Sequence, residues 1–307
     1  MPYEYEEVYL TVTNPDALNL SAPILFLARG HSGTSPLTKF LEASGVYVGN
    51  VEDENCLNVT YDSLYFTFEF QRSLLPRLFK YGAGCVVDER EVTAAALKCL
   101  KNHLAYYSGG RWGFKTCAGM FSHPLYNYIF PNAKYIYIVR DGRDVILSGG
   151  GNFHLSHPKT RKRFWEYFKI ITFGISNDVQ SCPFEFSDKP RKNDAVIQNR
   201  FWIQAKSWRE HVRMMKHLEK TGRLSPNVHP VRYEELCSDP IPVLEKLSDF
   251  LDLEFTPEVQ SFSKQLFHAK SIGRWKNYKQ FINPGNEDMA KVFASMEPEL
   301  EMLGYTE

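Results

Sequence analysis

The sequence predicts a single α/β domain with a mostly parallel central sheet flanked by helices. Short apolar or β-branched runs, which are typical of buried strands, alternate along the chain with segments of helical periodicity. The 307 residues are 43% hydrophobic and 23% charged, an ordinary globular composition that argues against disorder, collagen and coiled coil. Strands that alternate with helices fold most simply as a parallel sheet covered by helices.

The first strand and the turn after it are the clearest elements. Residues 23–28 (PILFLA) form an apolar run bounded by Pro and Gly, which predicts a buried strand. The segment Gly30 to Gly33 predicts a turn, and the apolar spacing after Thr34 predicts a helix. Residues 45–49 (GVYVG) predict a second strand.

The same alternation continues to the C-terminus, apart from one segment. Further helices are predicted over 91–107, from Asp144 through Ser148, over 197–221 and over 239–251, and further strands over 111–115, 134–139 and 228–232. Pro230 indicates an edge or strand-end position, because proline has no N–H to give to a neighbouring strand. Residues 151–200 break the pattern and carry part of the basic excess. We expect an inserted lid or acceptor-binding segment there, within one domain over 1–307.

Charge is balanced overall but unevenly distributed. The 36 basic and 36 acidic residues cancel, which argues against a nucleic-acid polymer as a partner. Net charge is −6 over 1–100, +4 over 101–150, +8 over 151–225 and −6 over 226–307. A basic middle favours an anionic ligand there, although a solvated surface explains it equally well.

The sequence carries no signal for secretion or membrane insertion. The acidic start MPYEYEEVYL lacks the features of a signal peptide, and the longest apolar run is too short to span a bilayer. Six scattered cysteines without a CxxC pair are typical of free thiols in a reducing compartment, and their spacing gives no zinc site. We therefore expect a soluble cytoplasmic protein without a metal, and the sequence leaves its oligomeric state open.

The residues from Arg29 to Ser35 (RGHSGTS) lie between a predicted strand and a predicted helix. Glycines let backbone N–H groups turn toward an anion, the helix N-terminus adds its positive end, and hydroxyls add donors. The alternative is a plain strand–turn–helix connection capped by Thr34 or Ser35. No Lys follows Gly33, so the loop is not a Walker A motif and the usual Mg-ATP chemistry is disfavoured.

Residues 135–148 (YIYIVRDGRDVILS) place an arginine at a strand end and a serine in the next helix. The guanidinium of Arg140 can bind a phosphate bidentately, and the hydroxyl of Ser148 can add one hydrogen bond. The alternative is a surface pair between Arg140 and Asp144, with Ser148 simply exposed.

Together these motifs resemble those of sulfotransferases that use 3′-phosphoadenosine 5′-phosphosulfate (PAPS), in particular bacterial members with a GHSGT loop. In that family the first loop binds the 5′-phosphosulfate end, and the strand-end Arg and helix Ser bind the 3′-phosphate. Residues 231–236 (VRYEEL), followed by Asp239-Pro240, resemble a further family segment whose Tyr lies near the adenine. Residues 271–277 (SIGRWKN) resemble the loop that closes over the nucleotide. The resemblance implies a P-loop-like fold and a donor site made of Arg29, His31, Ser32, Gly33, Thr34, Ser35, Arg140, Ser148, Tyr233, Gly273, Arg274, Trp275 and Lys276.

Two positions depart from the family pattern. His31 stands where Lys or Arg is usual, but an imidazole still donates a hydrogen bond, and Arg29 lies nearby. The family's Lys-Thr-His segment, whose His is the base in small-molecule members, becomes Lys115-Thr116-Cys117. The resemblance implies that Lys115 stabilises the transferring sulfuryl group, with a surface lysine as the alternative. Cys117 is a poor base beside anions, because their field raises its pKa.

The general base must then be another residue. Carbohydrate and tyrosyl-protein members of the family use a carboxylate after the second strand. The candidates here are Asp62 and Asp53 first, then Glu52 and Glu54, with His123 and His154 outside that group.

The resemblance implies an enzyme that moves a sulfuryl group from PAPS to a hydroxyl or amine, releasing 3′,5′-ADP without a metal. The acceptor is a small molecule or a glycan. We favour a carbohydrate or glycolipid, because the basic residues within 159–163 and 191–192 attract anionic glycans. The aromatic side chains in 61–70 suit a sugar ring, a lipid or the core equally well. The alternatives are a nucleotide-dependent small-molecule kinase with a degenerate P-loop and a non-catalytic nucleotide-binding protein on the same fold.

Overall fold

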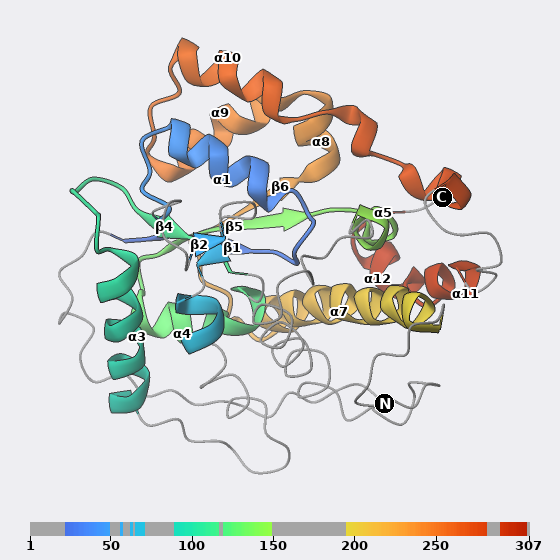
Figure 1. The fold of residues 1–307 in the computed structure, drawn as a ribbon, viewed down its shortest axis with the longest axis horizontal. Coiled ribbons are helices and arrows are strands. Elements are labelled where there is room, and N and C mark those ends of the chain that lie inside the picture. The colour runs from blue at the N-terminus through green and yellow to red at the C-terminus, as the bar shows by residue number, and fades with distance from the viewer. Residues whose placement is uncertain are drawn as a thin grey trace.

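The computed structural model describes residues 22–49, 56–57, 62–63, 65–70, 89–116, 119–148, 195–280 and 289–305 (Figure 1). Its centre is a parallel sheet with the strand order β4-β1-β5-β6. The strands are β1 Ile24–Leu27, β4 Gly113–Phe114, β5 Lys134–Val139 and β6 Val228–Arg232. Strand β1 pairs in parallel with β4 and β5, and β5 pairs in parallel with β6, so the predicted parallel α/β architecture is confirmed.

Helices cover both faces of this sheet (Figure 1). One face carries α1 Thr34–Ala43, α8 Tyr233–Ser238, α9 Pro240–Leu251 and α10 Pro257–Leu266. The other carries α3 Glu89–His103, α4 Gly119–Ile129 and α7 Ala195–Lys220. The helices α5 Gly142–Ser148, α11 Met289–Ala294 and α12 Glu297–Met302 pack together with α7. The shorter elements are β2 Cys56–Leu57, β3 Asp62–Ser63, η2 Tyr65–Phe70, η4 Ala269–Ser271 and η5 Arg274–Gln280.

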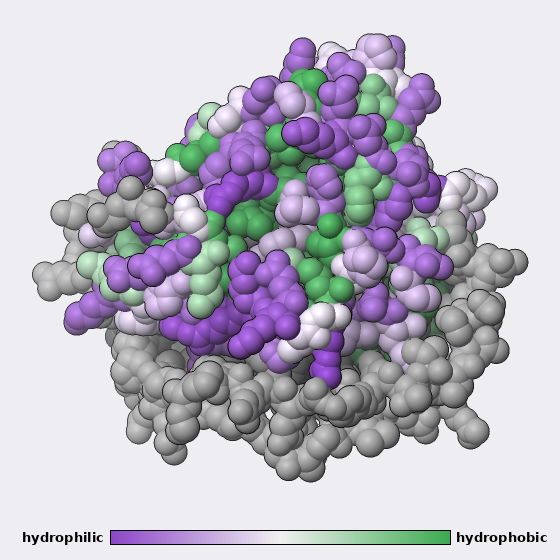
Figure 2. All heavy atoms as spheres, turned by 180° about the vertical axis from the view of Figure 1, so that it is seen from behind, coloured by the Kyte–Doolittle hydropathy of each residue, from purple (hydrophilic) through white to green (hydrophobic). Residues whose placement is uncertain are grey.

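The apolar run of β1 is explained by burial on both faces. Ile24 and Phe26 pack in the cluster that contains α1, α8 and α9, whereas Leu25 and Leu27 pack in the cluster that contains α3, α4 and α7. A strand that is covered twice needs apolar residues in succession rather than in alternation. On the face seen from behind, hydrophilic side chains dominate the described surface, with hydrophobic ones gathered between them near its middle (Figure 2).

The structure confirms the predicted strands at 23–28, 134–139 and 228–232 within a residue or two of their ends. It also confirms the edge position of Pro230, because β6 ends the sheet and Pro230 is exposed. The helix over 119–129 was not predicted from the sequence, and it contains Pro124.

The strand predicted at 45–49 is wrong. Only Tyr47 reaches the sheet, through an isolated parallel bridge to Trp112. Gly45 and Gly49 adopt φ values of +79° and +111°, so the backbone is left-handed on both sides and cannot continue a strand.

The helix predicted over 91–107 is also shorter than expected at its C-terminal end, since it stops at His103. The amides of Ala105 and Tyr107 bond to the carbonyls three residues earlier, which tightens the chain into turns. Residues 151–194 lie outside the described residues, so the inserted segment at 151–200 and the single domain over 1–307 stay predictions. Within the described helices, none is long and apolar enough to cross a membrane.

Candidate functional site

The carboxyl ends of the four parallel strands bring the predicted donor residues to one edge of the sheet. Strand β1 leads into the loop before α1, β4 leads to Lys115, β5 leads to Arg140 and β6 leads to Tyr233. Ligands of open parallel α/β sheets bind at this edge, because the connecting loops and helix N-termini converge there. Residues that are far apart in the sequence are thereby gathered at one place.

The loop between β1 and α1 turns through two left-handed residues. His31 has a φ of +70° and Gly33 a φ of +98°, and Gly33 is the N-cap of α1. The alternative that Thr34 or Ser35 caps the helix is therefore wrong, since both lie within its first turn. A glycine N-cap has no side chain to occupy the first amides of α1, which suits an anion at that end.

Replacing Gly33 with alanine is expected to destabilise this loop. An added Cβ would lie 2.4 Å from the ring of Tyr233, and the φ of +98° is unfavourable for a residue with a side chain. We expect the free energy of unfolding in urea to fall by about 1–3 kcal/mol. Gly30→Ala is the matched control, because no atom lies within 4 Å of its added Cβ. Equal stability of the two variants would contradict this account of the loop.

Lys115 follows β4 and reaches the start of α1. Its Nζ donates to Ser35 Oγ over 3.2 Å, and the residue is only 4% exposed, so the alternative of a surface lysine is wrong. The amide of Ser63 donates to the carbonyl of Lys115 over 2.9 Å. The backbone of Asp62, the neighbour of Ser63 in β3, therefore runs beside Lys115.

Arg140 joins the first loop to the C-terminal loop. Its Nη1 donates to the carbonyl of His31 over 2.7 Å and its Nη2 to the carbonyl of Ser271 over 2.8 Å. The guanidinium also lies over the ring of Tyr233, 4.1 Å from its centroid. Arg140 is buried, and its Nε has no hydrogen-bond partner in the part of the chain that the structure describes.

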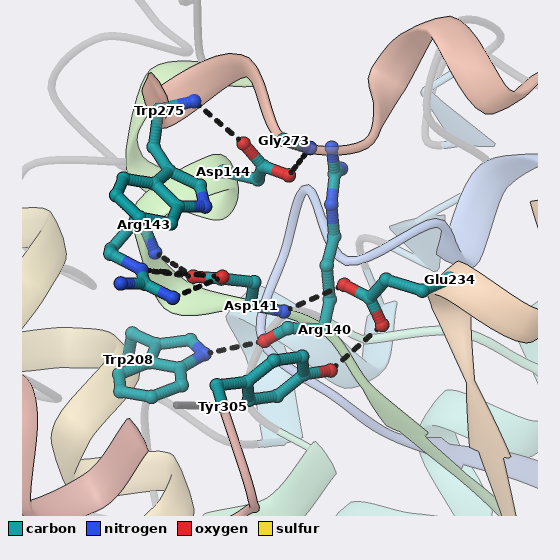
Figure 3. Close-up of polar contacts among 9 residues, drawn as sticks. All are labelled: Arg140, Asp141, Arg143, Asp144, Trp208, Glu234, Gly273, Trp275 and Tyr305. Carbon is teal, nitrogen blue, oxygen red and sulfur yellow. Dashed lines mark hydrogen bonds and ion pairs between the residues drawn. The ribbon is translucent and has the colours of Figure 1, made fainter. Parts of the chain in front are cut away.

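The residues after Arg140 form a polar network (Figure 3). Asp144 is 1% exposed and accepts from the amides of Gly273 and Trp275 over 2.7 and 3.0 Å. The alternative of a surface pair with Arg140 is therefore wrong. Burial raises the pKa of Asp144 above its ordinary value, and hydrogen bonds from those two amides and the charge of Arg140 partly offset the rise. The carboxylate of Asp141 meanwhile binds the guanidinium of Arg143 bidentately.

Three further residues hold the turn that carries Arg140. The indole Nε1 of Trp208 donates to the carbonyl of Arg140 over 3.3 Å. Glu234 accepts from the amide of Asp141 over 3.0 Å and from the hydroxyl of Tyr305 over 2.8 Å. Sequence reasoning missed these contacts because each joins segments that lie far apart along the chain.

The other donor-site candidates differ in how far they are exposed to solvent. Arg29 is buried and donates to the carbonyl of Gly30 over 2.9 Å. Ser32 and Thr34 are also buried, whereas the side chain of His31 is exposed. Ser148 is half-buried at the last residue of α5, and Arg274 is half-buried beside the exposed Lys276.

Most base candidates cannot be compared with Lys115, because the structure does not describe them. Asp53, Glu52, Glu54, Cys117 and His154 lie outside the described residues. His123 is fully buried and its Nε2 accepts from the amide of Ser225, just before β6 and thus at the amino edge of the sheet. Burial lowers the pKa of His123 to about 4. This position separates His123 from Lys115, so it is excluded as the base.

The arrangement fits an anionic nucleotide. Nη1 and Nη2 of Arg140 donate to carbonyl oxygens and not to a carboxylate, and its buried Nε still lacks an acceptor in the described part of the chain. A phosphate oxygen supplies the acceptor that such a donor needs. Across the described ranges, no group of three or more His, Cys, Asp or Glu residues is placed to hold a metal ion.

The fold and this edge define an α/β protein with a candidate anion site between its first and its C-terminal loop. The family model of the sulfotransferase domain matches residues 120–286, more than half of the chain. The chain therefore belongs to the sulfotransferase family, and it is a sulfotransferase. The matched segment includes Arg140, Ser148, Tyr233 and the loop at 271–277, but not the first loop or Lys115.

Three solved structures are similar over most of the chain. A sulfotransferase domain from the curacin biosynthetic pathway is 19% identical, with a TM-score of 0.43, covering 94% of this chain and 99% of that one. A sulfotransferase domain from the Synechococcus PCC 7002 olefin synthase is 16% identical, with a TM-score of 0.46, covering 97% and 100%. Mouse sulfotransferase SULT7A1, complexed with PAP, is 14% identical, with a TM-score of 0.44, covering 93% and 89%. Because these scores are low, the family assignment rests on the family model.

Proposed function

We propose that the protein transfers a sulfuryl group from PAPS to a hydroxyl or amine of a carbohydrate or glycolipid acceptor, releasing 3′,5′-ADP. The observation that carries the proposal is the position of Arg140. Its guanidinium bridges the carbonyls of His31 and Ser271 at the meeting point of the two loops, and its buried Nε lacks an acceptor among the described residues. A 3′-phosphate at this point would give Arg140 a charge-assisted partner.

The donor brings an activated sulfuryl group, and the chain supplies position and charge. Sulfuryl transfer resembles loose phosphoryl transfer, in which orientation and electrostatic stabilisation carry most of the acceleration. The amides at the start of α1 and the hydroxyl of Thr34 would orient the 5′-phosphosulfate. Lys115, buried beside Ser35, would stabilise the negative charge that develops on the bridging oxygen. His31 would add a hydrogen bond from its exposed imidazole.

The general base removes the proton of the acceptor as the new bond to sulfur forms. We propose Asp62 for this role, ahead of Asp53, because the backbone at Asp62 runs beside Lys115. A carboxylate there would take the proton while the bond between sulfur and the 5′-phosphate oxygen breaks in line.

The preference for a carbohydrate or glycolipid acceptor rests on the basic sequence clusters. Two aromatic residues of the segment 61–70 do not contact an acceptor, because Phe66 and Phe70 are fully buried in the core. Phe66 stacks on Phe114 with a centroid distance of 3.8 Å, so these two rings serve packing.

Radiolabelled PAPS with a panel of glycans, glycolipids, phenols and peptides tests the proposal. We expect label transfer to a glycan or glycolipid, and none from radiolabelled ATP. We also expect 3′,5′-ADP at a hundredfold excess over its Kd to stabilise the fold by about 2.7 kcal/mol, measured as a thermal shift. Asp62→Asn and Asp53→Asn, assayed side by side, then separate the two base candidates. Stabilisation by ATP without any effect of 3′,5′-ADP would overturn the proposal.

A further inference from the structure

The loop at residues 271–275, here called the Gly273 loop, is tied to the start of α5 by a single carboxylate. Oδ2 of Asp144 accepts from the amide of Gly273 over 2.7 Å, and Oδ1 accepts from the amide of Trp275 over 3.0 Å (Figure 3). Each carboxylate oxygen therefore serves one amide. The φ of +70° at Gly273 lies in the left-handed region that glycine adopts readily.

A second contact holds the same loop from the neighbouring residue. The guanidinium carbon of Arg143 lies 3.5 Å from the centroid of the Trp275 ring. Asp141 fixes that guanidinium, with Nε donating over 3.1 Å and Nη2 over 2.9 Å. The segment 141–144 thus contacts both the backbone and the indole of the Gly273 loop, while Arg140 contacts its first carbonyl at Ser271.

A buried carboxylate at this position needs a reason, because its desolvation opposes ionisation. Asp144 is almost completely buried, and burial raises its pKa despite the two amides and the charge of Arg140. Neighbouring Asp141 raises that pKa further. An apolar residue would fill the same place without this cost, but it could not bind the two amides. The presence of a buried carboxylate at position 144 is explained by its hydrogen bonds to the amides of Gly273 and Trp275.

We infer that Asp144 is a positioning residue for donor binding, which fixes the Gly273 loop beside Arg140 before the nucleotide arrives. The inference rests on the proposed function, because it assigns the loop to the donor site. It divides the segment 140–148 between two tasks. Arg140 and Ser148 are assigned to the proposed phosphate, whereas Asp144, supported by Arg143, holds the loop that covers it. A preformed loop lowers the ordering cost of binding.

Calorimetric titration of the full chain with 3′,5′-ADP tests this assignment. Asp144→Asn keeps one acceptor oxygen and turns an NH₂ group toward the second amide, so we expect about a tenfold loss of affinity. Asp144→Ala loses both acceptors and is expected to bind more weakly still. Glu299→Gln is the control, because Glu299 of α12 is equally buried and binds Arg209 and Arg213 of α7, outside the donor site. It is expected to lower stability in urea while keeping the wild-type affinity.

Fluorescence of Trp275 without nucleotide gives an independent readout of the loop. Subtracting the emission spectrum of Trp275→Phe from that of the unchanged protein gives the contribution of Trp275. We expect this emission to shift to longer wavelength in Asp144→Asn, because the indole becomes more exposed. Wild-type affinity in Asp144→Asn, or an equal loss in Glu299→Gln, would overturn the inference and leave the proposed function standing. Absence of 3′,5′-ADP binding by the wild type would instead overturn the proposed function. The Trp275 spectrum would then decide alone whether Asp144 holds the loop.

Discussion

Arg140→Ala is expected to lower the affinity for 3′,5′-ADP by about thirtyfold or more, since truncating one side of a buried charged contact costs about 2–5 kcal/mol. Arg140 occupies a position that no other described residue shares, with one nitrogen on the carbonyl of His31 and another on that of Ser271. The substitution removes the proposed phosphate ligand and also the bridge between the two loops. Calorimetric titration with 3′,5′-ADP measures the loss directly.

Two control variants separate these contributions. Arg140→Lys keeps the charge but loses the planar fork, so we expect an intermediate affinity. Arg111→Ala removes one positive charge from an exposed pair with Asp252 and is expected to bind 3′,5′-ADP normally. Urea unfolding of all three variants shows whether the fold persists. An unchanged affinity in a folded Arg140→Ala variant would contradict the assignment of Arg140 to the 3′-phosphate.

The sequence was sufficient to predict the central architecture, because the two middle strands, β1 and β5, are buried on both sides. Residues 23–28 and 135–139 are apolar, aromatic or β-branched without interruption, a local pattern that is typical of a covered strand. The ends of those strands then located the first loop and Arg140. The segment 45–49 has similar composition but begins and ends with a left-handed glycine, and this backbone geometry decided against a strand.

The contacts that hold the site together could not be predicted in the same way. Asp144 and Gly273 are 129 residues apart, and no periodic pattern connects an acid in one helix with an amide in a distant loop. The same holds for the bridge from Arg140 to Ser271, which spans 131 residues. The sequence shows Asp144 four residues after Arg140, and from the sequence alone Arg140 is the nearest partner for its carboxylate. Only the folded structure shows that the backbone amides of Gly273 and Trp275 donate to the carboxylate of Asp144.

Lys115 illustrates a residue whose role was implied by resemblance and whose surroundings the structure now supplies. It is 4% exposed, its Nζ donates to Ser35 Oγ, and its carbonyl accepts from Ser63 beside Asp62. A lysine so enclosed holds its Nζ close to the N-terminus of α1, where the proposed bridging oxygen would lie. Its effect should therefore fall on the transition state more than on the bound nucleotide.

Lys115→Ala is expected to reduce kcat for transfer from PAPS by about a hundredfold to a thousandfold, the range for loss of one preorganised charge stabiliser. Affinity for 3′,5′-ADP should fall far less, because that product lacks the sulfuryl group.

Lys115→Met keeps the side-chain volume and guards against a cavity in this buried place. Lys134→Ala is the matched control, since it removes the same charge from the opposite end of the sheet, where Lys134 pairs with Asp252. Turnover with the acceptor found in the screen and calorimetry with 3′,5′-ADP measure the two quantities. A group that acts only on the charge developing in the transition state lowers kcat without lowering the affinity for 3′,5′-ADP. If Lys115→Ala lost nucleotide affinity as strongly as it lost kcat, Lys115 would instead belong to nucleotide binding.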